Sequence, residues 1–237
     1  MANQKTNSSA AAAPVSRVPR SHEQARKTYN RLSAVYDWFA GSEWQYTRQA
    51  IELLALRPGE VSLEIGFGTG RALVELAQLI GAGGHAHGID LSSGMLAVAQ
   101  KKLHTAGLDK RASLLIGDGL NLPYAPASMD AVLMSFTLEL FDTPDIPRVL
   151  AECRRVLKPT GRLAVTALSK TAQAGLITRA YEWGHTHFPT LLDCRPIYLG
   201  DALRLAGFTL VQEQHFELYG LPVGVVLANI LDAARAG

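Results

Sequence analysis

The chain has 237 residues, of which 48% are hydrophobic, and this is enough for one large domain with a sizeable buried core. Charged residues make up 19% and the formal net charge is only +2, which argues against the strongly basic face of a nucleic-acid-binding protein. No apolar run approaches the roughly 18 residues that a membrane-spanning helix needs.

The N-terminal segment, residues 1–20, has no acidic residue and no continuous apolar core. It is therefore not a secretory signal, and we predict a disordered basic tail, with a short organellar transit peptide as the alternative. Residues 21–237 are predicted to form a single domain. Cys153 and Cys194 lack the spacing of metal ligands and are interpreted as thiols in a reducing compartment, which predicts a cytoplasmic protein.

Two helices are predicted at the start of this domain. Residues 21–40 begin with a suitable N-cap, Ser21, and aromatic or apolar side chains then recur at three- and four-residue steps. A second helix over residues 42–56 ends before Arg57-Pro58-Gly59, which is a stop signal. We expect residues 21–56 to form a helical cap.

Short apolar strands then alternate with helices. Strands are predicted at residues 61–65, 85–89, 112–116, 130–135, 162–167, 208–217 and 221–230, and helices at 71–80, 92–105 and 146–157. The last of these helices is expected to stop at a loop over residues 158–161. Alternation of this kind predicts crossover units and a parallel sheet covered on both faces. Because only three residues separate the last two strands, they must pair antiparallel. The predicted fold class is α/β, with a doubly wound, mainly parallel seven-stranded sheet that ends in an antiparallel hairpin.

A long connection, residues 171–200, interrupts the sheet before this hairpin. It contains the aromatic residues Tyr181, Trp183 and Phe188. Long connections are often lids over active sites, so we predict a helical insertion that packs with the Tyr29/Tyr36 helix to form an apolar acceptor pocket.

A glycine-rich loop lies between the first strand and its helix. Gly66, Gly68 and Gly70 allow a sharp turn and the close approach of a ligand to the main chain. The helix that follows offers amide groups to an anion. Dinucleotide-binding folds have the spacing G-x-G-x-x-G, whereas this loop has G-x-G-x-G, and this difference disfavours an NAD-dependent oxidoreductase.

Two carboxylates follow the next strands. Asp90 ends the second strand, where it can accept hydrogen bonds from ribose hydroxyls, while Ser92 and Ser93 are available to cap the helix. Asp118 follows the third strand and can reach an adenine amino group. Ligands of open α/β sheets bind at the carboxyl ends of the strands, so these groups predict a nucleoside-like ligand.

Four motifs together resemble the class I S-adenosylmethionine-dependent methyltransferases. They are LEIGFGTG at residues 63–70, GIDLSSGML at 88–96, GDGLNLPY at 117–124 and RRVLKPTGR at 154–162. The resemblance runs from about Arg57 to the C-terminus and implies S-adenosylmethionine as the cofactor. It implies cofactor contacts from Tyr36, Glu64, Gly66, Phe67, Gly68, Gly70, Asp90, Leu91, Met95, Asp118, Gly119 and Ser135.

Within this superfamily, YNRLSAVYD at residues 29–37 is similar to the entry motif of the ubiquinone/menaquinone-biosynthesis C-methyltransferases. That resemblance implies methylation of a polyprenylated quinol ring. Thr160 replaces a glycine usual in that family, Gly119 replaces a common alanine, and TLELF at residues 137–141 differs from the quinone enzymes. These departures affect the substrate assignment more than the fold or the cofactor.

Candidate catalytic residues are Tyr29, Glu139 and His185. Glu139 follows the fourth strand and could bind an acceptor hydroxyl or take its proton, and His185 has an unperturbed pKa near neutrality. His185 and His187 do not face the same way on a helix, and we predict no metal.

The favoured hypothesis is methyl transfer to a small hydrophobic acceptor, most simply the carbon of a quinol or similar ring, without nucleic acid. Alternatives are phospholipid or amine N-methylation, O-methylation of a small metabolite, and a catalytically silent cofactor-binding scaffold. Basic residues between Arg17 and Arg31 allow peripheral contact with membrane lipid. The oligomeric state is left open.

Overall fold

The structure is a computed structural model that describes residues 41–170 and 194–230. In chain order its elements are α3 (Trp44–Leu54), β1 (Val61–Ile65), α4 (Arg71–Leu79), β2 (His85–Asp90), α5 (Ser93–Thr105), β3 (Ala112–Ile116), β4 (Met129–Ser135), the 3₁₀ turn η1 (Leu138–Leu140), α6 (Ile146–Val156), β5 (Leu157–Leu168), α8 (Leu199–Leu205), β6 (Phe208–Leu218) and β7 (Leu221–Ile230). The seven predicted strands are all present, whereas the sequence reasoning did not foresee η1 and α8.

The strands form one seven-stranded sheet in the order β3-β2-β1-β4-β5-β7-β6. Strands β1 to β5 pair in parallel, and β7 pairs antiparallel with both β5 and β6. Tyr219 and Gly220, both with positive φ, close the hairpin of β6 and β7. The predicted mainly parallel sheet with a C-terminal hairpin is therefore confirmed.

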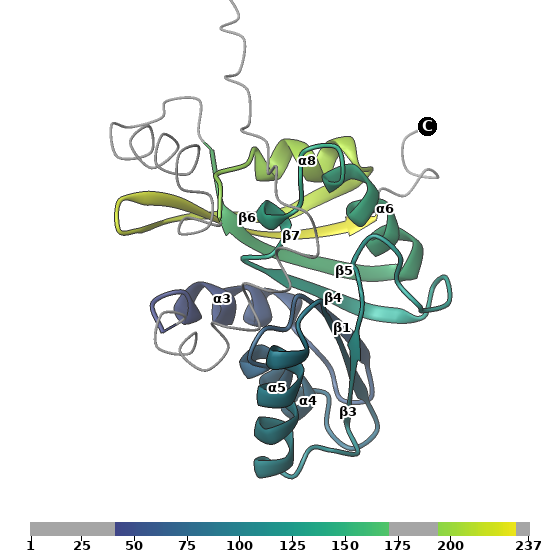
Figure 1. Cartoon of the computed structure of the whole chain (residues 1–237). Coiled ribbons are helices and arrows are strands. Elements are labelled where there is room, and N and C mark those ends of the chain that lie inside the picture. Colours follow the sequence, from purple (N-terminus) through teal and green to yellow (C-terminus); the bar gives the residue numbers. More distant parts are fainter. Residues whose placement is uncertain (1–40, 171–193, 231–237) are drawn as a thin grey trace, which may run out of the picture.

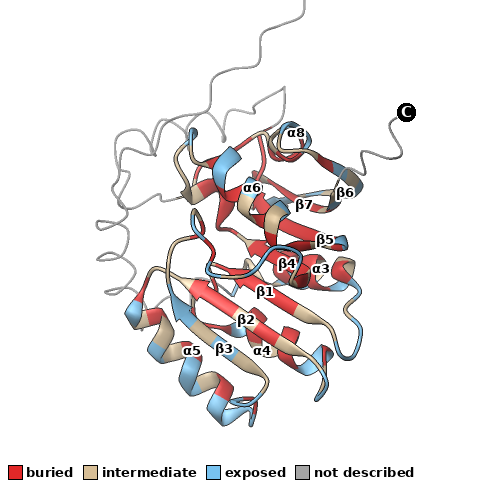
Figure 2. Cartoon of the chain, turned by 90° about the vertical axis from the view of Figure 1, so that its right-hand side faces the viewer, coloured by how far each residue is buried: buried red, intermediate tan, exposed pale blue. Residues whose placement is uncertain are grey.

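Side chains alternate between two hydrophobic cores, one on each face of the sheet. On β4, Val132 and Met134 pack into the core covered by α6 and α8, whereas Ala131 and Leu133 pack into the core covered by α3 and α4. Figure 1 shows these helices on opposite sides of the sheet. Buried residues concentrate on the central strands, while the edge strand β3 is largely exposed (Figure 2). The parallel part of the sheet is thus fixed from both sides.

Strand β5 begins earlier than the predicted residues 162–167. Helix α6 ends at Val156, and the chain continues directly as β5 from Leu157. Leu157 pairs with Met129 and Arg162 pairs with Ala131, so residues 158–161 have no partner on β4 and bulge out of the ladder. A Cβ on Gly161 would lie 2.9 Å from the Lys158 carbonyl oxygen, so the chain turns at the predicted stop signal. Lys158 donates to both carboxylate oxygens of Asp130, at 2.7 and 2.8 Å.

Helix α3 contacts both the carboxyl end of β4 and the hairpin of β6 and β7. The Thr47 and Ser135 hydroxyls lie 2.7 Å apart, and the Tyr46 hydroxyl donates to the Glu217 carbonyl at 2.6 Å. The Tyr46 ring also packs against Phe216, with centroids 5.4 Å apart. Among the described residues, no helix is both long enough and apolar enough to cross a bilayer.

We expect Tyr46→Phe to lower the free energy of unfolding by about 0.5–1.5 kcal/mol, because it removes one hydrogen bond and keeps the ring packing. Urea denaturation measures this change. Tyr219→Phe is the matched control, since Tyr219 is 81% exposed at the hairpin tip. Equal stability changes in the two variants would show that the Glu217 bond contributes nothing.

Candidate functional site

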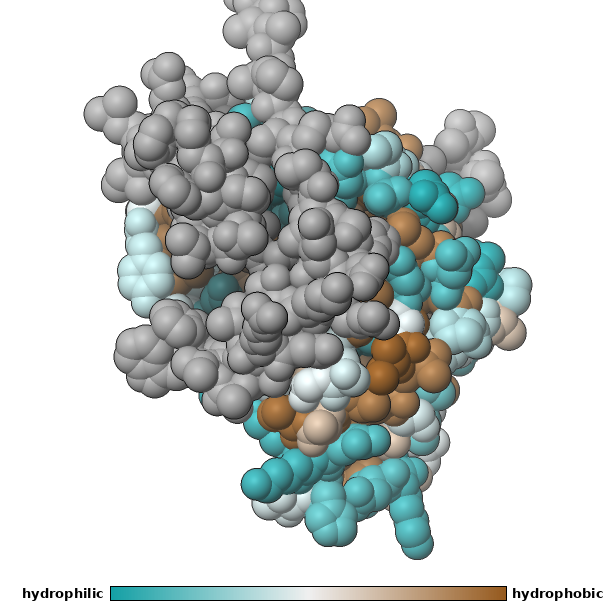
Figure 3. All heavy atoms as spheres, viewed as in Figure 1, coloured by the Kyte–Doolittle hydropathy of each residue, from teal (hydrophilic) through white to brown (hydrophobic). Residues whose placement is uncertain are grey.

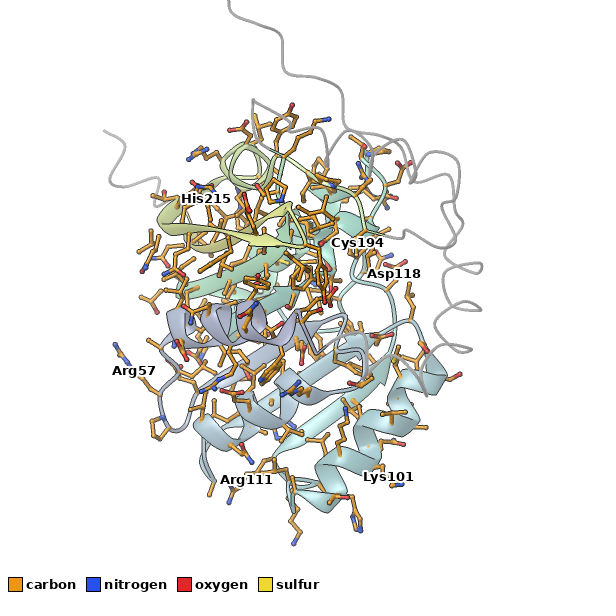
Figure 4. All side chains as sticks on the ribbon, turned by 90° about the vertical axis from the view of Figure 1, so that its left-hand side faces the viewer. Arg57, Lys101, Arg111, Asp118, Cys194 and His215 are labelled. Atoms are coloured by element: carbon orange, nitrogen blue, oxygen red, sulfur yellow. The ribbon has the colours of Figure 1, made fainter. Side chains whose placement is uncertain are left out.

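The site lies at the carboxyl edge of the parallel strands. Figure 4 shows Asp118, which follows β3, and Cys194 on the same side of the molecule, with Arg57, which precedes β1, on the opposite side. Figure 3 looks onto the carboxyl edge of the strands, where the described surface around the grey residues mixes polar and apolar side chains. The ends of β1, β2, β3 and β4 therefore bring the predicted cofactor residues together.

The three glycines of the loop after β1 have different roles. All have positive φ: +75° at Gly66, +51° at Gly68 and +77° at Gly70. A Cβ on Gly66 would lie 2.4 Å from the Thr137 hydroxyl oxygen, and one on Gly70 would lie 2.6 Å from the Ala99 Cβ. Nothing lies within 4 Å of the Cβ position of Gly68. Gly66 and Gly70 permit packing, whereas Gly68 leaves space for a ligand.

Asp90 fixes this loop from the end of β2. One carboxylate oxygen accepts from the Gly68 amide at 2.9 Å, and the other accepts from the Ser92 amide at 2.8 Å. The N-cap of α5 is Ser92, whose hydroxyl accepts from the Met95 amide at 3.1 Å. Burial raises the pKa of Asp90, and the amide bonds oppose this shift. Each oxygen has remaining acceptor capacity, which fits the hydroxyls of a ribose.

We expect Asp90→Ala to weaken S-adenosylmethionine binding by about 1.5–3 kcal/mol, as measured by calorimetry. The variant loses the acceptor for ribose hydroxyls and also the bond that holds Gly68. A cofactor fragment without ribose hydroxyls should lose much less affinity. Equal losses for the two ligands would mean that Asp90 acts only by shaping the loop.

Glu64 contributes a buried carboxyl group beneath the same loop. It is 3% exposed, and one of its oxygens, Oε2, is buried without a hydrogen-bond partner. Burial and the neighbouring Asp90 raise its pKa well above the ordinary value, while a bond from the Leu73 amide opposes the shift. The Glu64 carboxyl thus accepts a hydrogen bond from an amide in the first turn of α4, where an anionic ligand was expected to bind. A buried carboxyl oxygen without a hydrogen-bond partner fits a cofactor with a cationic amino group.

The remaining predicted cofactor residues surround this loop. Phe67 and Met95 are buried and pack together with Ala99. Asp118 accepts from the Leu120 amide at 3.0 Å. Gly119 packs tightly, since a Cβ there would lie 3.1 Å from Ile65, Phe141 and Val149. Leu91 is half-buried just after β2. The proposed roles of these residues in cofactor binding stay predictions.

The turn after β4 packs against the loop after β1 and the loop after β3. Phe136, with φ +49°, takes the left-handed conformation that bulky residues rarely adopt. This turn sends the chain back across the edge of the sheet, so that Thr137 meets Gly66 and Phe141 meets Gly119. Unfavourable backbone of this kind concentrates at functional sites. Glu139 lies in η1, between the two residues that make these contacts.

Glu139 is fully buried in η1. Its Oε1 accepts from the Leu168 amide at the end of β5, at 3.1 Å, and its Oε2 is buried without a hydrogen-bond partner. Burial raises its pKa to about 8, from an ordinary value near 4.5. Glu43 raises this pKa further, whereas Arg195 and two backbone amides lower it. A carboxyl group with such a pKa can both hold and accept a proton near neutral pH.

Three predicted site residues, Tyr29, Tyr36 and His185, lie outside the described residues, and so do most of the 171–200 insertion and the 1–20 tail. Residues 194–198 of that insertion are described and are not helical. They run extended, with a bridge between Ser169 and Ile197, before α8 begins at Leu199.

Three features of the site were not predicted from the sequence. Arg195 is fully buried beside η1, yet an arginine before a proline is typical of an exposed loop. Thr137 sets the glycine requirement at position 66, and no local pattern indicates that contact. The hydroxyl pair of Thr47 and Ser135 likewise joins residues 88 positions apart.

Comparison with known proteins relates this chain to methyltransferases. A family described as "methyltransferase domain" matches residues 63–161. A nocamycin O-methyltransferase from Saccharothrix syringae is 31% identical over 211 residues, which cover 80% of this chain and 74% of that enzyme. A demethylmenaquinone methyltransferase from Lactobacillus johnsonii is 33% identical over 147 residues. That match covers 60% of this chain and 59% of the enzyme, so it spans less than two thirds of the relative.

The fold is also found among solved structures. A SAM-dependent methyltransferase from Aquifex aeolicus has a TM-score of 0.58 and 22% identity to this chain, covering 78% of this chain and 89% of that one. At this identity the likeness shows the fold alone.

Proposed function

We propose that this chain methylates a small hydrophobic acceptor at a carbon of a hydroxyl-bearing ring such as a quinol. The chain belongs to the class I S-adenosylmethionine-dependent methyltransferases. The observation that carries the proposal is the buried carboxyl of Glu139, which has one oxygen without a hydrogen-bond partner and lies in the turn that packs against the loops after β1 and β3. The 33% identity to a demethylmenaquinone methyltransferase supports a ring acceptor.

On the cofactor side, we assign Gly68 to the open approach, Asp90 to the ribose hydroxyls and Glu64 to the cationic amino group. Asp118 is assigned to the adenine. Bound S-adenosylmethionine supplies a methyl group on a positively charged sulfur. The chain's own task is alignment of the acceptor and exclusion of water.

On the acceptor side, replacing a ring hydrogen or a hydroxyl hydrogen by methyl releases one proton. We assign Glu139 to take up the proton of the acceptor hydroxyl, because ionisation of that hydroxyl makes both the oxygen and the adjacent ring carbons more nucleophilic. In C-methylation the hydroxyl regains a proton when the methylated ring carbon loses its hydrogen, so one proton is released overall. Tyr29 and His185 remain proposed acceptor-side residues, and Tyr36 and Ser135 remain proposed cofactor contacts. The 171–200 insertion remains a proposed cover of the acceptor.

O-methylation is the second candidate. The match to the nocamycin O-methyltransferase covers 80% of this chain, more than the 60% covered by the quinone enzyme. The same proton acceptor serves both reactions, so the position of the new methyl group separates them.

The test is incubation with isotopically methyl-labelled S-adenosylmethionine and three probes. These are a reduced prenylated naphthoquinone without a ring methyl, a small phenol, and vesicles that contain an amine-headgroup phospholipid. We expect label on a ring carbon of the first probe, located by NMR of the product. Label on oxygen alone would replace C- by O-methylation, and label in the phospholipid would contradict a ring acceptor.

A further inference from the structure

Three charged side chains from distant parts of the sequence lie on segments that pack at the carboxyl ends of β4 and β5. Glu139 is in η1, Glu43 is the N-cap of α3, and Arg195 is in the segment before α8. Glu139 and Arg195 are both fully buried. Buried charged groups are costly, so a cluster of this kind calls for an explanation beyond stability.

Arg195 is held against the turn that carries Glu139. Its Nη2 donates to the carbonyl oxygen of Phe141, two residues beyond Glu139, at 2.7 Å. Glu139 itself is fixed from the other side by the Leu168 amide. The guanidinium therefore lies beside η1 in a defined place and favours a negative charge on Glu139.

Glu43 approaches the same turn from α3. One helical turn later, Thr47 contacts the Ser135 hydroxyl at 2.7 Å, and the Thr166 hydroxyl donates to the Tyr46 carbonyl at 3.4 Å. These contacts fix the first turn of α3 against the carboxyl ends of β4 and β5. Burial raises the pKa of Glu43 to about 7, and its charge disfavours a second negative charge on Glu139.

Among the described residues, Lys170 is a further charged group at this end of β5, two residues after Leu168. It is 7% exposed, and its ammonium lies 5.8 Å from the centroid of the Tyr198 ring. In the described part of the chain, the charges of Glu43 and Arg195 shift the pKa of Glu139 in opposite directions.

We propose that Arg195 and Glu43 are positioning residues for methyl transfer, which act through Glu139 by favouring, respectively, its carboxylate and its neutral acid. This inference rests on the proposed function, in which Glu139 receives the acceptor's proton. In that step the acceptor O–H bond breaks and its proton moves to Glu139 Oε2. The electron pair of the resulting oxyanion forms the new bond from the ring carbon to methyl, while the methyl–sulfur bond of S-adenosylmethionine breaks and its electron pair stays on sulfur. The methylated ring carbon then loses its hydrogen as a proton and the oxygen regains one, so that one proton is released overall. The proton passes to water after the product leaves.

The test compares the pH profiles of kcat/KM for the naphthoquinol probe. Arg195→Met should move the rising limb to higher pH and Glu43→Gln to lower pH, each on the order of one pH unit. Arg195→Lys keeps the charge and should restore the parent profile. Glu52→Gln and Arg204→Met remove charges from side chains that are 56% and 55% exposed, and should leave the limb in place.

A second measurement does not need an acceptor. The Glu139 carboxyl is titrated by NMR in protein labelled with ¹³C at the glutamate carboxyls, and Glu139→Gln identifies its signal. Opposite shifts of this titration in Glu43→Gln and Arg195→Met support the inference even if the naphthoquinol is no substrate. A failure of the inference can therefore be told apart from a failure of the proposed function.

Shifts of the same sign in these two variants, or a Glu139 titration that neither variant moves, would overturn the inference. If Arg195→Met does not fold, Glu43→Gln alone decides, because an unchanged Glu139 titration in that folded variant contradicts the proposal.

Discussion

Gly68→Val is expected to reduce S-adenosylmethionine affinity at least about 100-fold, which corresponds to ~2.7 kcal/mol. The position of its Cβ is open, with nothing within 4 Å, so the valine side chain would occupy the space assigned to the ligand and would not clash with the protein. Calorimetry with the folded variant measures the loss.

The substitution also carries a backbone cost, because φ at Gly68 is +51°. A left-handed residue with a side chain costs roughly 1–2 kcal/mol, and a β-branched side chain is worse than alanine. Gly107→Val is the matched control, since Gly107 has φ +69°, has nothing within 4 Å of its Cβ position and lies after α5. It should lose similar stability and retain cofactor affinity. Unchanged affinity in Gly68→Val would mean that the loop does not hold the cofactor.

Glu139→Gln is expected to lower kcat about 10²–10⁴-fold, the range for loss of a general base, with cofactor affinity unchanged. In the parent enzyme kcat/KM should rise with pH to a plateau, with a midpoint near the Glu139 pKa of about 8. The variant should lack this limb, because glutamine keeps the acceptor for the Leu168 amide but cannot take a proton. A variant with parent-like rates across this pH range would give Glu139 a purely structural role.

The same residue predicts how stability depends on pH. The pKa of Glu139 is raised in the fold to about 8 from an ordinary value near 4.5. Its contribution to stability is therefore fully present below about pH 4.5 and is lost as pH rises through 8. Because the side chain is fully buried, this loss is on the order of several kcal/mol.

Urea denaturation between pH 5 and pH 9 measures this linkage. The parent should lose stability over that range faster than Glu139→Gln. The two unfolding curves would run parallel with pH if the carboxyl group were already ionised in the folded protein at pH 5.

The sequence by itself determined the succession of strands along the chain, the antiparallel hairpin and the glycine loop. These features depend on short-range signals, namely apolar alternation, turn residues and glycine spacing, which specify local backbone wherever the segment lies. Asp90 and Asp118 were predictable for the same reason, since the carboxyl ends of parallel strands meet at one edge. The stop signal at residues 158–161 ends α6 and leaves these residues unpaired, but the pairing of Leu157 with Met129, which starts β5 before them, has no local signal.

Only the tertiary structure decided the surroundings of Glu139. The bond from Arg195 to Phe141 joins residues 54 positions apart, and Thr47 meets Ser135 across 88 positions. No periodicity or motif encodes such pairs. The protonation of a buried carboxyl depends on desolvation and on neighbouring charges, which here come from α3 and from the segment before α8. That packing sets the chemistry of Glu139, because burial and neighbouring charge arise only once the chain has folded.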